Sequence, residues 1–144
     1  MIEKDTVKLL RECDAGVKMG IDSIEQVIES VNSKDFKSIL GECKREHKAL
    51  ETEILSLLDG YGDDGKKPNP IAKATSHVMT EMKMLMNGGD GTIADLMTDG
   101  CNMGVKSLNK YLNEYKAASE RSKDVTKRLI NLEEKLAVDI RGYL

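Results

Sequence analysis

The sequence contains few aromatic residues and almost no proline. Its 144 residues include no Trp, one Phe and two Pro, and aromatic residues make up 3% of the chain. The β-branched residues do not alternate with polar ones, as they would in strands with one buried face. Most sheet architectures are therefore excluded, and the core must be built from Leu, Ile, Val and the eight Met residues.

The sequence also lacks a large excess of charge of either sign. The 22 Lys and Arg residues are interspersed with 25 Asp and Glu residues, which gives a formal net charge of −3. A surface that binds nucleic-acid phosphates needs clustered Lys and Arg, interleaved with aromatic residues if it binds single strands. The sequence has neither feature, so we expect no nucleic-acid partner.

Cysteines and long apolar runs are few as well. The three cysteines, Cys13, Cys43 and Cys101, are widely spaced and form no Cys-x-x-Cys motif. Cys43 and Cys101 lie on apolar stripes, which indicates small buried side chains in a reducing compartment. The N-terminal sequence has no apolar core of a signal peptide, and no apolar run reaches the roughly 18 residues of a membrane span. We expect a cytoplasmic protein that does not associate with membranes.

Apolar residues recur every three or four positions in the first third of the chain, which is typical of one face of an amphipathic helix. The first helix is predicted at about residues 5–31, and its apolar stripe contains one polar residue, Asp14. Gly16 and Gly20 lie four residues apart beside this stripe. Glycine costs up to about 1 kcal/mol relative to Ala inside a helix, so the two glycines indicate a close approach of another helix.

The second helix is predicted at about residues 34–59, where one polar residue, His47, again interrupts the apolar stripe. Asn32 and Ser33 separate it from the first helix, and either residue can cap its N-terminus. Because the connection is so short, the two helices must be antiparallel neighbours.

The segment 59–70 is dense in Gly, Asp and Pro and indicates a flexible linker. Gly60, Gly65 and Lys66 imitate the spacing of a phosphate-binding P-loop, but Lys67 stands where Ser or Thr would hold magnesium. A helix, not a strand, precedes this segment, and its acidic residues lack the spacing of a calcium-binding EF-hand. We therefore expect neither a nucleotide site nor a calcium site here.

A shorter helix is predicted after the linker, with Asn69 as its cap and Pro70 at its first helical position. It ends near Asn87, and about 17 residues in a helix span about 25 Å, enough to carry the chain from one end of a bundle to the other. Four of its residues between positions 79 and 86 are methionines. They indicate core filling or, alternatively, an adaptable contact surface.

Two long helices complete the predicted set. One opens with a capping box over residues 92–95 and extends to about Tyr115. The other follows a break at 117–123, whose serines can cap it, and continues to the C-terminus. Its buried stripe includes either Asp139 or Ile140 near its end.

These elements predict one all-α domain over residues 1–144, a four-helix bundle with a shorter crossover helix between its second and fourth helices. Two stretches carry a resemblance to a known family. They are Leu10–Ile24, with its turn Asp14-Ala-Gly16, and Ile93–Tyr115, in which a small-residue kernel is followed by Lys and an aromatic residue. With this helix order, the chain resembles the ferritin-like bundles, and it is similar to a group of small bacterial ferritin-like proteins of unknown function.

The resemblance implies a dimetal site, which needs one Glu from each of two helices and a Glu-x-x-His pair from each of the other two. Here Lys44 stands three residues before His47, where a bridging carboxylate would be required. The last helix has no His, and the helix before it has no Glu on its apolar stripe. We therefore expect no metal and no other cofactor. If a metal does bind, the candidate ligands are Asp14, Glu46 and His47.

Asp14 and His47 are the polar members of two apolar stripes, and an isolated charged Asp is costly in a core. Counting residues from the helix ends places the two side chains within about one helical turn of each other, so we predict that they pair. The same count places Leu129 and Ile130 of the last helix at the level of His47. Glu133 is expected on a solvated face.

The sequence predicts a non-catalytic bundle with a scaffold or interaction role and a degenerate dimetal site. No catalytic Ser/His/Asp or Cys/His set can be assembled, and Cys43, which shares a face with His47, indicates a buried thiol rather than a thiolate–imidazole pair. The alternative is a ferritin-like iron or manganese oxidoreductase, or a metal-handling protein. A third possibility is a bundle that holds an apolar ligand in a Met-lined cavity. Self-association through Gly16, Gly20 or the Met-rich surface is expected.

Overall fold

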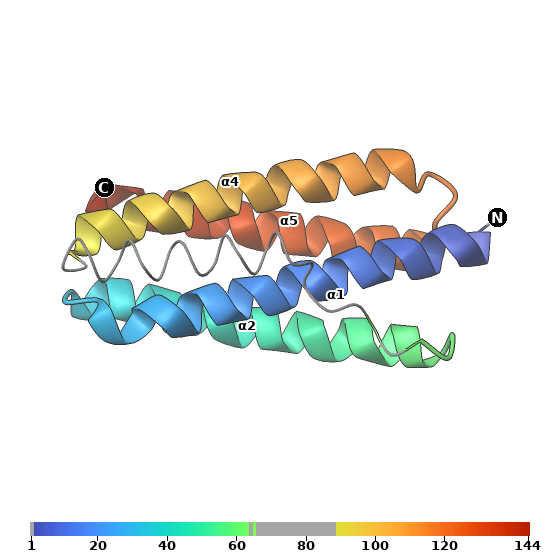
Figure 1. Cartoon of the computed structure of the whole chain (residues 1–144), viewed down its shortest axis with the longest axis horizontal. Helices are drawn as coiled ribbons and strands as arrows, with labels where there is room; N and C mark the ends of the chain where they lie inside the picture. The colour runs from blue at the N-terminus through green and yellow to red at the C-terminus, as the bar shows by residue number, and fades with distance from the viewer. Residues whose placement is uncertain (1, 64, 66–88) are drawn as a thin grey trace.

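In a computed structural model, residues 2–63, 65 and 89–144 are described, and this part of the chain is helical without strands. Four long helices lie side by side along one axis (Figure 1). Two short 3₁₀ segments follow the first and the last of them. The elements are α1 (Ile2–Val27), η1 (Ile28–Ser30), α2 (Lys34–Asp59), α4 (Asp90–Glu114), α5 (Glu120–Ile140) and η2 (Arg141–Tyr143).

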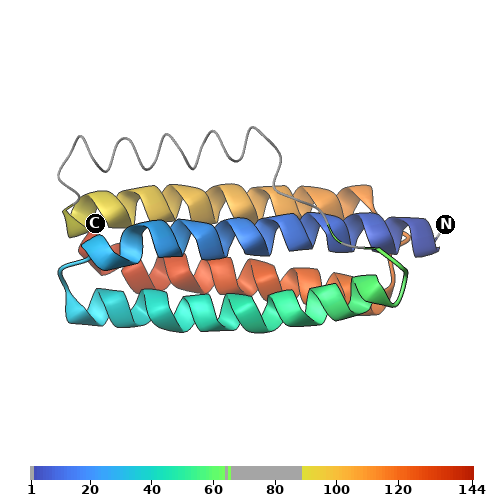
Figure 2. The ribbon, with the colours of Figure 1, turned by 60° about the horizontal axis from the view of Figure 1, so that its bottom comes forward.

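The four helices form two antiparallel hairpins, α1 with α2 and α4 with α5 (Figures 1 and 2). The hairpins pack so that α2 lies against α5 and α1 lies against α4. The end of α2 and the start of α4 are at opposite ends of the bundle (Figure 1). This all-helical, four-helix arrangement confirms the coarse prediction of the fold. The predicted shorter helix and most of the predicted linker lie outside the described residues.

The core is aliphatic, as the composition requires. Each helix turns one stripe of apolar residues inward, and α1 contributes the predicted residues from Leu10 to Ile24. On α5 the alternative left open is decided, because Ile140 is fully buried and Asp139 is exposed. The largest fully buried apolar side chains are Phe36, Leu9, Leu10, Ile24, Leu40, Ile54, Leu58, Ile93, Leu129 and Ile140.

The helix ends follow the sequence at two N-terminal caps and depart from it elsewhere. Ser33 caps α2 by accepting a hydrogen bond from the backbone N–H of Phe36, and Ser119 caps α5. The first helix ends at Val27, four residues earlier than predicted, because the chain tightens into a 3₁₀ turn before it reverses. The predicted capping box at residues 92–95 is wrong, since α4 begins two residues earlier, at Asp90.

Asp90 holds one end of the bundle together. Its carboxylate accepts hydrogen bonds from the backbone N–H groups of Asn32 and Ser33, at 2.7 and 2.9 Å. The rings of Phe36 and Tyr143 stack at the same end, with their centroids 4.6 Å apart. The turn between α1 and α2 is thereby fixed to the start of α4 and to the C-terminal segment, which sets how far each helix extends along the bundle.

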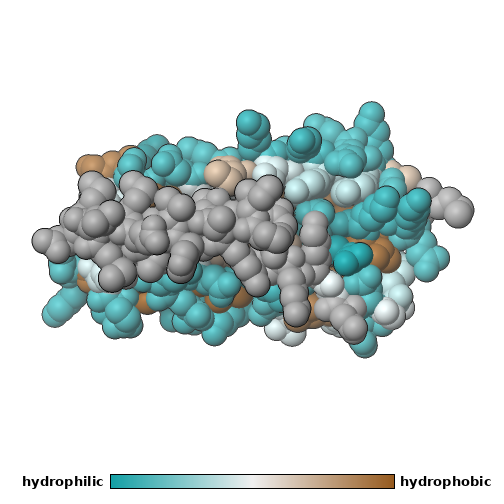
Figure 3. Space-filling model, in the orientation of Figure 1, coloured by the Kyte–Doolittle hydropathy of each residue, from teal (hydrophilic) through white to brown (hydrophobic). Residues whose placement is uncertain are grey.

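Hydrophilic residues cover most of the coloured part of the face shown in Figure 3. In the part of the chain that the structure describes, the large hydrophobic side chains that are exposed are Tyr61, Met103, Val138 and Leu144. Among the described residues, none of the helices combines the length and the apolar character that a membrane crossing demands.

Candidate functional site

His47 lies at the middle of α2 and points into the bundle, with 1% of its surface exposed. Both ring nitrogens face oxygen atoms. Nδ1 lies 2.8 Å from the backbone carbonyl oxygen of Cys43, one turn earlier in α2. Nε2 lies 2.7 Å from Oε1 of Glu133 on α5, whose side chain is 12% exposed. The imidazole therefore links the two hairpins through a short hydrogen bond.

This arrangement determines how many protons the pair carries. A carbonyl oxygen only accepts hydrogen bonds, so Nδ1 must carry a proton. A second proton must lie between Nε2 and the Glu133 carboxylate, because two lone pairs would repel each other at that distance. Burial by itself favours the neutral ring, but hydrogen bonds with Cys43 and Glu133 and the negative charge of Glu133 raise the pKa of His47 to about 10. The pair is thus an imidazolium and a carboxylate in the core.

Two glycines lie beside this pair, and one of them, Gly20, makes room for it. A Cβ atom at Gly20 on α1 would lie 2.6 Å from Nε2 and 2.7 Å from Cδ2 of His47, which is closer than atoms can pack. At Gly104 on α4, a Cβ atom would touch the Glu133 carboxylate at 3.6 Å. The predicted close approach at glycine is confirmed at Gly20. At Gly16 a Cβ would make only an ordinary contact, 3.8 Å from Leu129.

Two buried thiols complete what we call the central polar cluster, defined as Cys43, His47, Cys101 and Glu133. The Cys43 sulfur lies 3.4 Å from Nδ1 of His47, so the two residues share a face as predicted. Cys101 on α4 lies beside the Glu133 carboxylate, and burial together with that negative charge raises the pKa of its thiol. The cluster therefore joins α2, α4 and α5 through one chain of polar contacts.

The predicted pairing of Asp14 with His47 is wrong. Asp14 is fully buried, but its Oδ2 accepts a hydrogen bond from Nζ of Lys18 at 2.7 Å. Gly65 packs onto the same carboxylate, where a Cβ atom would lie 2.3 Å from Oδ2. The residue of α1 opposite His47 is Gly20, six positions from Asp14, which is about 9 Å along a helix.

Glu46 lies apart from both. It is half-buried and lines a shallow groove of about 280 Å³ between α2 and α5, together with Glu53 and Arg128. Asp14, Glu46 and His47, the candidate metal ligands from the sequence, therefore do not converge. Among the described residues, no group of three or more His, Cys, Asp or Glu side chains is arranged to hold a metal ion. The dimetal ligand set that a ferritin-like bundle requires is not assembled there.

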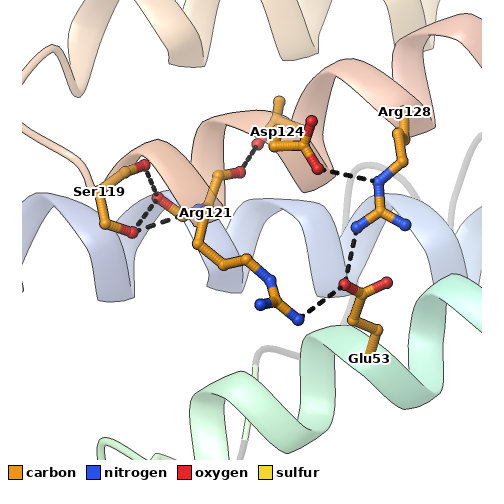
Figure 4. A network of polar contacts seen from close by, with 7 residues as sticks. Glu53, Ser119, Arg121, Asp124 and Arg128 are labelled. Carbon is orange, nitrogen blue, oxygen red and sulfur yellow. Dashed lines mark hydrogen bonds and ion pairs between the residues drawn. The ribbon is translucent and has the colours of Figure 1, made fainter.

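A second polar network crosses the same pair of helices near the surface. Figure 4 shows Arg121 and Arg128 pointing from α5 toward Glu53 on α2. Arg128 donates to Oε1 of Glu53 at 2.7 Å and to Asp124 at 3.2 Å, and Arg121 donates to the same Glu53 oxygen at 3.3 Å. The hydrogen bond from Arg128 holds the pKa of Glu53 below its usual value. These contacts tie α2 to α5 through one oxygen of Glu53.

Sequence reasoning missed Glu133, which was expected on a solvated face. One signal could have found it. Glu133 lies four residues after Leu129 and three before Leu136, so it occupies a position that continues the buried stripe of α5. The residue count from the helix ends was also about one turn out, because α4 begins at Asp90 and α5 ends at Ile140 rather than at the C-terminus.

Comparison of the chain with protein-family models, with curated proteins and with solved structures gives no match.

Proposed function

We propose that the protein is a non-catalytic, ferritin-like four-helix bundle that acts as a scaffold or interaction protein. The observation that supports this proposal is the hydrogen bond between His47 Nε2 and Glu133 Oε1, 2.7 Å long in the middle of the core. A histidine ligates metal through a nitrogen lone pair. In His47 both nitrogens carry protons that are used in hydrogen bonds, so the imidazole acts as a structural cation.

The remaining polar groups of the cluster are also held by contacts within the protein. The Glu133 carboxylate accepts a hydrogen bond from His47, and the Cys101 thiol is held in its neutral form by burial and by the adjacent negative charge. A catalytic centre needs a nucleophile, base or ligand that can reach a substrate. Cys43, His47 and Cys101 are each at most 5% exposed.

Self-association is part of the proposal, but not through the glycines that the sequence favoured. Gly20 packs against His47 and Gly16 against Leu129, within the same chain. The candidate Met-rich surface lies outside the described residues. The oligomeric state can be read directly from light scattering of the purified full-length chain.

Metal content tests the functional proposal. The purified protein is incubated with ferrous iron, manganese or zinc, desalted, and analysed for bound metal and for oxidase activity. We expect no stoichiometric metal and no activity. His77→Gln is the matched control for His47→Gln, because these are the two histidines of the chain. About one or two metals per chain, lost in His47→Gln but retained in His77→Gln, would overturn the proposal.

That outcome would support the alternative, a metal-binding ferritin-like protein. One observation favours it as the second candidate, since an imidazole, a carboxylate and a thiol from α2, α5 and α4 meet in one contact chain. Metal would then have to displace the proton shared by His47 and Glu133, so its binding would weaken steeply as the pH falls.

A further inference from the structure

The His47–Glu133 pair and the two glycines beside it divide evenly between the two helical hairpins. In the first hairpin, α2 supplies His47 and α1 supplies Gly20, whose missing side chain gives the imidazole its space. In the second, α5 supplies Glu133 and α4 supplies Gly104, where a Cβ atom would be in ordinary contact with the carboxylate at 3.6 Å. Each hairpin thus carries one charged group and one glycine at the same level of the bundle.

Apart from the contacts of Asp90 at one end of the bundle, of Glu53 near the surface and of Thr126 with Cys13, the inter-hairpin contact is largely aliphatic, and its apolar positions repeat every three or four residues. On α5 the positions one turn before and one turn after Glu133 are Leu129 and Ala137. Apolar stripes of this kind specify packing weakly, since sliding by one turn replaces one apolar contact with another. In either slipped packing, however, His47 would face an apolar side chain and its charge would be buried without a partner.

We propose that the His47–Glu133 pair, seated between Gly20 and Gly104, is the lock that fixes the register in which the α1–α2 hairpin docks on the α4–α5 hairpin. Burying the two charges together adds little stability over an apolar pair of the same volume, because both lose their hydration. Leaving either charge unpaired in a slipped packing is strongly unfavourable. The pair therefore acts mainly against the competing packings. This inference does not depend on the function proposed above.

The test removes both charges at once in the full-length chain. Leu is close in volume to imidazole, and Met follows the shape of Glu, so His47→Leu/Glu133→Met keeps the core filled. We expect the double variant to stay fully helical by circular dichroism. Its amide ¹H–¹⁵N NMR spectrum should contain more than one peak for many residues, and hydrogen exchange in α2 and α5 should be at least about tenfold faster than in the wild type.

Two further variants separate a lock from a general loss of core packing. Thr126→Val removes another buried polar contact between the hairpins, the 3.1 Å hydrogen bond between Thr126 Oγ1 and Cys13 Sγ, but no charge. It should keep a single set of peaks. His47→Gln/Glu133→Gln retains a hydrogen-bonding pair without charge, because a side-chain amide both donates and accepts. This variant should also give a single set of amide peaks.

A single set of sharp peaks from His47→Leu/Glu133→Met, with the wild-type contacts between the hairpins, would overturn the proposal. So would an unfolded double variant, because a group that selects among packings is not required for folding itself. Metal binding by the wild-type chain would count against the proposed function and would leave these comparisons unaffected, so the two failures are distinguishable.

Discussion

Replacing Gly20 by Ala tests the central cluster with the smallest possible change. Ala normally stabilises a helix relative to Gly, by about 0.8–1.0 kcal/mol at an exposed interior position. At Gly20 the new Cβ would lie 2.6 Å from His47 Nε2 and 3.5 Å from Glu133 Oε1. The imidazole must move, and it has no alternative position that keeps both of its hydrogen bonds, since each nitrogen is already fixed to a different helix segment.

The magnitude follows from these two opposing effects. Breaking a buried, hydrogen-bonded ion pair costs about 3–5 kcal/mol when one charge is left without its partner. Subtracting the gain in helix propensity leaves a net loss of about 2–4 kcal/mol for Gly20→Ala. Small domains have total stabilities of about 5–15 kcal/mol, so this loss is a large fraction of the whole.

Urea unfolding followed by far-ultraviolet circular dichroism measures the difference. With a denaturant dependence of about 2 kcal/mol per molar urea, the midpoint of Gly20→Ala should fall by about 1–2 M. Two further Gly→Ala substitutions, on other helical turns, serve as controls. At Gly16 the added Cβ would meet Leu129 at an ordinary 3.8 Å, and at Gly100 it would meet nothing within 4 Å. Both controls should be as stable as the wild type or slightly more stable.

The sign of the change in unfolding free energy distinguishes the two possibilities: a loss of stability supports the close packing of His47 against Gly20, and a gain contradicts it. If Gly20→Ala were as stable as Gly16→Ala, the close packing of His47 against α1 would be refuted. The inference that the imidazole is held between Glu133 and Gly20 would fail with it.

Two further predictions concern charge. Because the pKa of His47 is raised from 6.5 to about 10, its protonation stabilises the fold fully below pH 6.5 and this contribution is lost as the pH rises through about 10. The unfolding free energy of the wild type relative to His47→Gln should therefore shrink by up to about 5 kcal/mol between pH 6.5 and 10.5, and a constant difference would contradict the shift. Asp90→Ala should lower stability by about 1–2 kcal/mol in urea unfolding, because the backbone N–H groups of Asn32 and Ser33 lose a charged acceptor. Asp95→Ala, an exposed change one turn later in α4, is the control. An equal effect of both changes would contradict the stabilising role of the hydrogen bonds to Asp90.

The fold was largely predictable because it depends on periodicity. The stripes of α1, α2, α4 and α5 are long enough that the 3.6-residue period stands out, and the serine at each of two helix starts is the preferred cap. The burial of His47 followed from the same pattern, because it interrupts an otherwise apolar stripe. These features are local, and each can be read within one helix.

The partners in the site were not predictable because they depend on register between helices. Asp14 was a reasonable partner for His47 by burial, but Lys18, four residues along the same helix, already neutralises it. Glu133 adjoins Glu134 and was expected to be solvated with it, although its position continues the apolar stripe of α5. The choice between the two acids depends on helix ends displaced by only a few residues, and no pattern within a single helix fixes those displacements.

Measuring the protonation state of His47 tests most directly whether the ring is an imidazolium paired with Glu133. Long-range ¹H–¹⁵N NMR distinguishes a neutral imidazole from one with two protonated nitrogens, and the His77→Gln variant assigns the signals, since the chain has two histidines. The account predicts that both nitrogens of His47 are protonated at pH 8 and that the ring titrates near pH 10. A neutral His47 at pH 8 with an unprotonated Nε2 would contradict it. That result would leave a lone pair free to bind metal and would remove the observation on which the proposed function rests.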